Sequence, residues 1–273
     1  MSSTNLSKTL REDPPEVDYE PPAKKLKKSK KSLSQVPVIP CPVDSLADLA
    51  FIPEKPLPAK NFAMYVVGAP GSGKTNLWVA MLTSQNPLYY RGLFNMIALV
   101  SASKDTLPKK VTTGKQGLPP EQQYMWLDDK VLIDIIVRFR KPKKNGNNLL
   151  ILDDVIKDIT RTRSLSKIFL NRRHATYDST KERSGGLSIM TMSQKYNLLP
   201  LEFRVVMSHV VLFKTENASE LKAIKNELMS ELNPEEQDKL LKKAWGEKYS
   251  FLLVDTQQCS GQRYFIKFEP YVF

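Results

Sequence analysis

An eight-residue glycine-rich segment constrains this chain more than any other feature. Its residues are Gly68-Ala69-Pro70-Gly71-Ser72-Gly73-Lys74-Thr75, which match the phosphate-loop pattern G-x-x-x-x-G-K-[ST] at every required position. The apolar run 62–67 predicts a buried strand before the segment, and residues 76–82 predict a helix after it. Glycines allow backbone N–H groups to face phosphate oxygens, and a helix N-terminus adds partial positive charge. A nucleoside triphosphate site is therefore favoured over a chance glycine-rich turn.

Individual roles follow from this motif. We expect the backbone of residues 68–75, with Asn76 beside it, to bind the nucleotide. Lys74 is predicted to contact the β- and γ-phosphates, and the Thr75 hydroxyl is predicted to bind Mg²⁺. ATP and Mg²⁺ are thus the expected ligands.

A pair of carboxylates forms a second motif. The aliphatic run 149–152 follows a polar turn at 141–148 and leads directly into Asp153-Asp154. A carboxylate at the end of a buried strand beside a phosphate loop can hold Mg²⁺, the usual Walker B role, which we assign to Asp153. Asp154 is then placed to orient or deprotonate the attacking water as general base. An ordinary pair of surface acids at a strand end is the alternative.

A polar pair also closes the next predicted strand. The apolar run 187–192 leads into Ser193-Gln194. An amide at such a strand end can contact the γ-phosphate or the attacking water, as a glutamine does in Ras-type enzymes. Gln194 is therefore the candidate γ-phosphate sensor, with a strand-capping amide as the alternative.

Strand and helix patterns alternate from residue 61 onward. Apolar runs predict strands at 62–67, 96–101, 149–152, 187–192, 205–214 and 249–254, and helical spacing predicts helices at 76–82, 128–139, 163–173 and 218–244. This alternation predicts an α/β fold with a mostly parallel, doubly wound sheet and helices on both faces. We expect three parts: a disordered basic tail (1–36), an extended lead-in (37–60) and a P-loop ATPase domain (61–273) with a C-terminal helical and strand addition.

Basic side chains are in excess, and the formal net charge is +12. Residues 61–273 carry 31 Lys and Arg against 21 Asp and Glu, a surplus of +10. A basic ATPase domain favours a polyanionic partner, most simply nucleic acid, over a merely soluble basic surface. The six lysines within residues 24–31 indicate either a nuclear-localisation or polyanion-binding segment or a solvated tail. No apolar run approaches the roughly 20 residues that a membrane-spanning helix needs.

These motifs occur in an order that resembles a known family. The phosphate loop, the strand ending in Asp153-Asp154, Arg173-His174, and the block 191–200 with Arg204 downstream resemble the genome-packaging ATPases of large eukaryotic DNA viruses, virophages and polinton-like elements. These proteins form the poxvirus-type branch of the FtsK–HerA superfamily. The resemblance covers roughly residues 60–215.

The resemblance implies a RecA-like (ASCE) core whose sensor strand lies between the phosphate-loop strand and the Walker B strand. It also implies a homo-oligomeric ring, most commonly a hexamer, that drives double-stranded DNA into a preformed capsid, with a capsid portal or vertex protein as a further partner. Lys74, Thr75, Asp153, Asp154 and Gln194 would take the roles given above. The implied location is the virion, an intracellular virus factory or the nucleus, without a membrane partner.

Basic side chains are the candidates for the trans arginine and for the DNA contacts. A ring ATPase usually needs an arginine from the neighbouring subunit to stabilise charge in the transition state. Arg204, which follows the sensor strand, is the first candidate, and Arg173 is the second. The polar loop 174–186 carries Lys181 and Arg183, which with Arg173 are the candidate DNA contacts. A plain surface connection is the alternative for this loop.

Two other classes of protein would have some of these sequence features. A HerA-like helicase or recombination ATPase would have the same core but act on DNA ends or forks. A P-loop kinase or ATP-binding regulatory module would bind ATP without moving DNA. DNA-stimulated ATPase activity separates this last class from both motors.

Overall fold

One nine-stranded sheet organises the domain, with the strand order β3-β2-β4-β5-β1-β6-β7-β8-β9. The computed structural model describes residues 49–112, 117–141, 146–177, 185–258 and 261–273. The chain divides into two units, Met1–Ile39 and Pro40–Phe273, and every described residue belongs to the second.

Helices and strands alternate through most of this unit. The strands are β1 (Ala63–Val67), β2 (Met96–Ser101), β3 (Gln123–Tyr124), β4 (Gly146–Asp153), β5 (Gly185–Ser193), β6 (His209–Phe213), β7 (Phe251–Asp255), β8 (Tyr264–Ile266) and β9 (Glu269–Pro270). The helices are α1 (Lys74–Thr83), α2 (Lys109–Thr112), α3 (Asp129–Phe139), α4 (Ile156–Arg161), α5 (Arg163–Leu170), α6 (Leu201–Arg204), α7 (Ala218–Leu228) and α8 (Pro234–Ala244).

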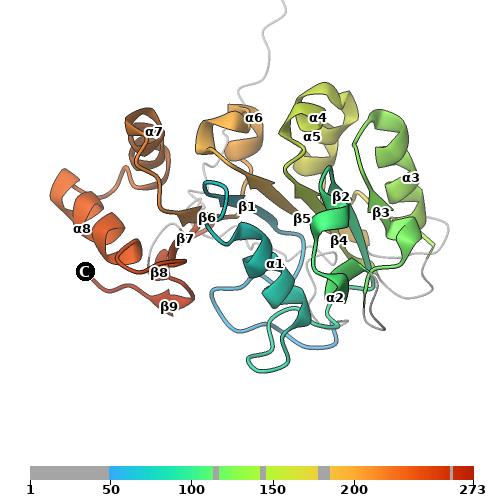
Figure 1. Cartoon of the computed structure of the whole chain (residues 1–273), viewed down its shortest axis with the longest axis horizontal. Helices are drawn as coiled ribbons and strands as arrows, with labels where there is room; N and C mark the ends of the chain where they lie inside the picture. The colour runs from blue at the N-terminus through green and yellow to red at the C-terminus, as the bar shows by residue number, and fades with distance from the viewer. Residues whose placement is uncertain (1–48, 113–116, 142–145, 178–184, 259–260) are drawn as a thin grey trace, which may run out of the picture. The chain divides into compact units, whose positions relative to one another are not determined.

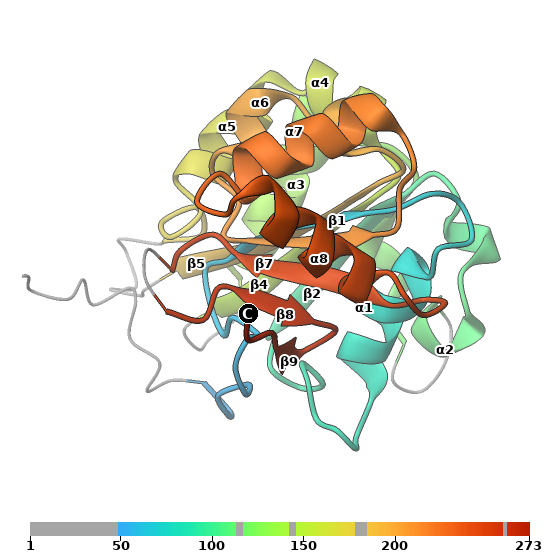
Figure 2. The same cartoon turned by 90° about the vertical axis from the view of Figure 1, so that its left-hand side faces the viewer.

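Helices cover both faces of the sheet (Figure 1). α1 and α2 lie on one face, where Trp78 and Val111 pack into one hydrophobic cluster. α3 to α7 lie on the opposite face, and Leu132, Phe169 and Ile224 join a second cluster there. In the turned view, α7 and α8 lie beside the C-terminal strands (Figure 2). This arrangement confirms the predicted doubly wound α/β fold.

The strand order brings the predicted motifs to one edge. β5 pairs in parallel with both β1 and β4, which is the position that the family resemblance implies for the sensor strand. The register places Val67 beside Ser193, and Ser101 beside Asp153. Because the carboxyl ends of parallel strands share an edge, the phosphate loop and the polar strand ends meet there.

The strand expected over 205–214 is wrong in its first part. α6 ends at Arg204, the side chain of Val205 is 69% exposed, and β6 begins only at His209. The backbone N–H groups of Val205 and Val206 donate to the carbonyl oxygens of Leu201 and Phe203, so these residues continue the turn of α6 and do not join the sheet. The β-branched valines after α6 therefore gave a misleading strand signal.

The helical segment predicted over 218–244 contains two helices, α7 and α8. Asn233 accepts a hydrogen bond from the backbone N–H of Glu236, and the Glu236 side chain accepts one from the backbone N–H of Asn233. This capping box, with Pro234 in the first turn, starts a separate helix.

Two strands begin earlier than their apolar runs predict. β4 starts at Gly146, inside the expected polar turn, and β5 starts at Gly185, inside the expected loop. A Cβ atom on Gly186 would lie 1.8 Å from Oδ1 of Asn61, so the position of the Asn61 side chain leaves room only for glycine here. Glycine and asparagine are rare in strands, which hid these extensions from the sequence pattern.

The C-terminal addition extends the sheet by antiparallel strands. β7 pairs antiparallel with β6, and β8 and β9 continue the sheet in the same way. The sequence predicted only the first of these strands. Ahead of the sheet, the described part of the lead-in packs onto the domain, where Leu57 is buried in the cluster under α1.

Candidate nucleotide-binding site

The phosphate loop joins β1 to α1. Gly71 and Gly73 adopt φ angles of 76° and 106°, which favour glycine, and α1 begins immediately afterwards at Lys74. The Lys74 ammonium donates hydrogen bonds to the carbonyl oxygens of Gly68 at 2.5 Å and Ala69 at 3.2 Å. Lys74, which the motif assigns to phosphate binding, therefore contacts the backbone of the phosphate loop itself.

Lys74 is buried, and two carboxylates interact with its charge. Burial lowers its pKa below the usual range, while the negative charges of Asp154 and Asp153 act in the opposite direction. Thr75 is half-buried in the first turn of α1, and Asn76 beside it is exposed. The structure thus brings the cation of the phosphate loop close to both predicted Walker B carboxylates.

Asp153 and Asp154 have different environments although they are neighbours. Asp153 ends β4 and is buried, whereas Asp154 is exposed and adopts a φ of 58°. Burial and the adjacent charge of Asp154 raise the pKa of Asp153 to about 6, against the opposing effects of Lys74 and Ser101. The Ser101 hydroxyl, at the end of β2, lies 3.4 Å from Asp153 Oδ2. Ser101 was missed by the sequence reasoning, although a polar residue at a strand end was the available signal.

The predicted sensor and the predicted general base are in contact. The Gln194 side-chain amide donates a hydrogen bond of 2.9 Å to Asp154 Oδ2. This contact fixes the orientation of one Asp154 oxygen and links the end of β5 to the end of β4. A carboxylate held in this way, at an exposed edge beside the phosphate loop, can orient a water molecule.

A buried tyrosine holds the segment that carries Gln194. The Tyr65 hydroxyl, on β1, lies 2.7 Å from Ser193 Oγ and donates toward the carbonyl oxygens of Lys195 at 3.0 Å and Tyr196 at 2.9 Å. Its hydroxyl thus joins the phosphate-loop strand to the turn that follows β5. No sequence pattern predicts these contacts of Tyr65, because a tyrosine in an apolar strand is typical of the core.

Arg204 is engaged within its own chain. Its Nη1 atom lies 3.1 Å from Glu227 Oε1 and donates to Asn197 Oδ1 at 3.1 Å, and its guanidinium lies 4.8 Å from the centre of the Tyr196 ring. Only 12% of the side chain is exposed. Action on a neighbouring subunit would require these contacts to break, so the role predicted for Arg204 stays a prediction with a competing structural role.

Of the other basic candidates, Arg173 is the one that the structure describes. Arg173 is exposed in the turn after α5. Lys181 and Arg183 lie outside the described residues. Among the described residues, the structure therefore brings together Lys74, Thr75, Asp153, Asp154 and Gln194. Arg204 instead contacts Glu227, Asn197 and Tyr196.

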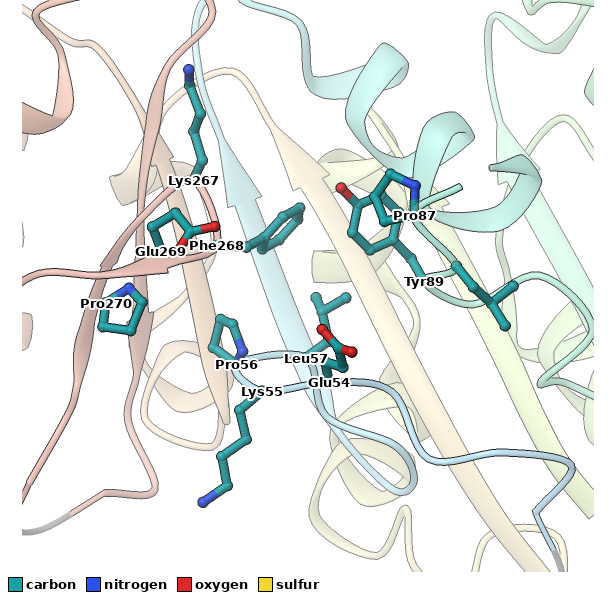
Figure 3. A pocket seen from close by; sticks show the side chains of 11 residues that line it. Glu54, Lys55, Pro56, Leu57, Pro87, Tyr89, Lys267, Phe268, Glu269 and Pro270 are labelled. Carbon is teal, nitrogen blue, oxygen red and sulfur yellow. The ribbon is translucent and has the colours of Figure 1, made fainter. Parts of the chain in front are cut away.

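A separate cavity of about 430 Å³ lies among the lead-in, the loop after α1 and the β8–β9 hairpin (Figure 3). Tyr89 and Phe268 face each other across it, with ring centres 5.2 Å apart. None of the predicted site residues within the described ranges lines this cavity.

Comparisons with known proteins identify the family and the fold. A family model described as "Poxvirus A32 protein" matches residues 51–264. No curated protein sequence matches the chain significantly. Among solved structures, B204, the DNA-packaging ATPase from Sulfolobus turreted icosahedral virus, is 16% identical over 78% of this chain and 100% of its own, with a TM-score of 0.53.

A related structure is B204 from Sulfolobus turreted icosahedral virus 2 in complex with ATP-gammaS. It is 17% identical over 77% of this chain and 98% of its own, with a TM-score of 0.51. At this identity both likenesses show a shared fold. Among the described residues, no helix is both long and apolar enough to cross a lipid bilayer.

Proposed function

The chain belongs to the poxvirus A32 protein family of genome-packaging ATPases, and on that premise we propose that it uses ATP hydrolysis to move double-stranded DNA into a preformed capsid. One observation supports this most directly: Lys74, Asp153, Asp154 and Gln194 converge at the carboxyl edge of the sheet. That edge is where ligands bind in open α/β sheets.

Each residue has a distinct part in the proposed hydrolysis. The backbone of the phosphate loop and Lys74 hold the β- and γ-phosphates. Asp154, oriented by Gln194, positions the attacking water and accepts its proton. Gln194 in turn reports the presence of the γ-phosphate to β5, which Tyr65 ties to the phosphate-loop strand.

Mg²⁺ fits the oxygen groups at this edge. Within the described ranges, no three His, Cys, Asp or Glu side chains gather to hold a metal by themselves. Mg²⁺ in nucleotide sites needs only one or two protein ligands, because phosphates and water supply the rest. Asp153 and Thr75 are the ligands that we propose, and the ion would neutralise charge on the phosphates. The raised pKa of Asp153 fits this role, since a bound cation would stabilise its buried charged form and offset the repulsion from Asp154.

DNA and further copies of the chain are the proposed partners. The surplus of +10 in residues 61–273 supports binding to a polyanion. A homo-oligomeric ring, most commonly a hexamer in this family, and a capsid portal or vertex protein complete the proposal. The proposed location is the virion, a virus factory or the nucleus.

ATP turnover with and without double-stranded DNA tests this proposal. We expect DNA to stimulate hydrolysis in the full-length protein, and Lys74→Ala to abolish both the basal and the stimulated rate while the protein stays folded. Thr83→Ala, at the other end of α1, is the matched control and should keep both rates. Wild-type turnover in folded Lys74→Ala would exclude hydrolysis at this site, and turnover without any response to DNA would exclude the motor.

A further inference from the structure

The carboxylates define which way a nucleotide must lie in the phosphate loop. β1 has β5 on one side and β6 on the other. Asp153, Asp154 and Gln194 all lie on the β5 side, so the γ-phosphate of a nucleotide bound as proposed above points in that direction. The base and ribose, at the other end of an extended triphosphate, must then project toward β6 and β7.

Three adjoining hollows occupy that side of the loop. They have volumes of about 380, 220 and 290 Å³, and Tyr249 lines all three. Two of them contact Gly73 and Asn76 at the start of α1, and two contact Phe213 at the end of β6. The surface next to the phosphate loop is therefore continuous with an aromatic-lined depression.

Tyr249 has features that ordinary packing does not explain. Its side chain is 56% exposed, although it lies directly against the loop: a Cβ atom on Gly73 would be 3.4 Å from Tyr249 Cδ1. Its φ of 63° is unfavourable for a bulky residue, and such backbone strain persists where the surrounding structure imposes it, often at functional sites. The Lys248 ammonium lies 4.8 Å from the centre of the ring and provides a cation at the same rim.

The walls of the depression are also fixed. Phe213 is buried under the loop, since a Cβ atom on Gly68 would lie 2.7 Å from Phe213 Cβ. The Trp245 indole donates a hydrogen bond of 3.0 Å to the carbonyl oxygen of Leu212, which holds its ring in the wall of the largest of the three hollows. A planar base could therefore enter between preformed aromatic surfaces without reorganising the core.

We propose that Tyr249 is the base-stacking residue of the ATP site, with Phe213 and Trp245 forming the walls of the nucleoside subsite. The proposal rests on the proposed function, because it requires a nucleotide bound through the phosphate loop. Stacking on an exposed aromatic ring accepts any purine, so Tyr249 contributes affinity for the nucleoside without selecting one base by hydrogen bonds. The segment between α8 and β7, part of the C-terminal addition, thereby becomes part of the ATP site.

A comparison of two ligands tests this assignment in the full-length protein. ATP contains the nucleoside and the triphosphate, whereas inorganic tripolyphosphate contains only the part that the phosphate loop holds. We expect Tyr249→Ala to weaken ATP binding about tenfold or more by calorimetry. Tripolyphosphate binding should change less than about twofold. Tyr249→Phe keeps the ring and should bind ATP like the wild type.

The controls separate this proposal from the proposed function. Trp126→Ala removes another exposed aromatic ring, beyond β3 at the far end of the sheet, and should leave both affinities unchanged. Lys74→Ala should weaken both ligands together. Wild-type protein that binds neither ligand would overturn the proposed function and the subsite with it. Normal tripolyphosphate binding together with unchanged ATP affinity in folded Tyr249→Ala, or an equal loss of both ligands, would overturn the subsite alone.

Fluorescence provides a second readout at the same place. Trp245 lines the depression, whereas Trp78 is fully buried under the sheet and Trp126 is remote. ATP should change the tryptophan emission, tripolyphosphate should leave it unchanged, and Trp245→Phe should abolish the change. An equal response to both ligands would show that no base reaches this depression.

Discussion

At the scale of single residues, Asp153 is expected to make the stability of the fold depend on pH. Its pKa is raised from the ordinary value of 3.8 to about 6, chiefly by burial. Between these two values the folded chain retains a proton that the unfolded chain has released. The free energy of unfolding should therefore fall as pH rises from about 4 to about 6, by up to about 3 kcal/mol without Mg²⁺. Urea unfolding at a series of pH values measures this dependence.

Asp153→Asn isolates that contribution. The amide has nearly the same shape and does not titrate, so the variant should lack the decrease and should be more stable than the wild type near pH 7. Asp105→Asn, an exposed carboxylate in the turn after β2, should leave the decrease in place. An unchanged pH profile in Asp153→Asn would show that another group causes it.

At the scale of elements, the sequence predicted where the parallel strands end better than where they begin. Asp153 and Gln194 were found because each follows an apolar run, and parallel topology places such strand ends together whatever the loops between them do. The starts of β4 and β5 were missed because Gly146 and Gly185 do not resemble strand residues. The contact between Gln194 and Asp154 was not predictable either, since it depends on side-chain orientation.

The hydroxyl of Tyr65 shows what tertiary structure adds. It connects β1 with the backbone after β5 through contacts to Ser193, Lys195 and Tyr196. Hydrophobic patterns report burial, but they carry no information on which buried polar group meets which partner. Hydrophobic patterns likewise do not show that Tyr249 lies beside the phosphate loop, because that position depends on the antiparallel pairing of β7 with β6.

Removing this hydroxyl should affect turnover more than nucleotide binding. Tyr65→Phe leaves the ring in place but removes the contacts behind Gln194, so we expect about 1–3 kcal/mol lower stability and a reduced kcat with little change in KM. Tyr90→Phe is the matched control, because that buried hydroxyl donates only to the carbonyl oxygen of Pro58 at 2.9 Å, away from the site. Equal effects of both variants on kcat would leave Tyr65 with a purely structural role.

At the scale of the whole molecule, the position of the charge predicts where DNA binds. Most of the surplus, +10 of +12, belongs to residues 61–273. A chain lacking residues 1–36 should therefore keep DNA-stimulated ATPase activity. Its affinity for DNA should fall steeply with salt, because phosphate contacts release counterions. Filter binding across a salt series measures this, and complete loss of the DNA response on truncation would assign binding to the tail.

A ring ATPase would need an arginine supplied in trans by the neighbouring subunit. Arg204 is held by Glu227 and Tyr196 in its own chain, where its removal should cost about 1–3 kcal/mol of stability. Arg173 lies exposed on the surface. The sequence ranks Arg204 first and Arg173 second as the trans arginine. From the structure we expect the opposite ranking, with Arg173 acting across the subunit interface and Arg204 positioning the segment after Gln194.

Mixing inactive variants separates these two roles. In a ring of Arg173→Ala and Lys74→Ala subunits, some interfaces pair an intact phosphate loop with an intact arginine, so hydrolysis should return above the level of either parent. Arg204→Ala mixed with Lys74→Ala should give no such recovery, because a defect inside the subunit accompanies every intact phosphate loop. Native mass spectrometry confirms that mixed rings form. Recovery with Arg204→Ala instead would restore Arg204 as the trans arginine and show that its pair with Glu227 opens in the ring.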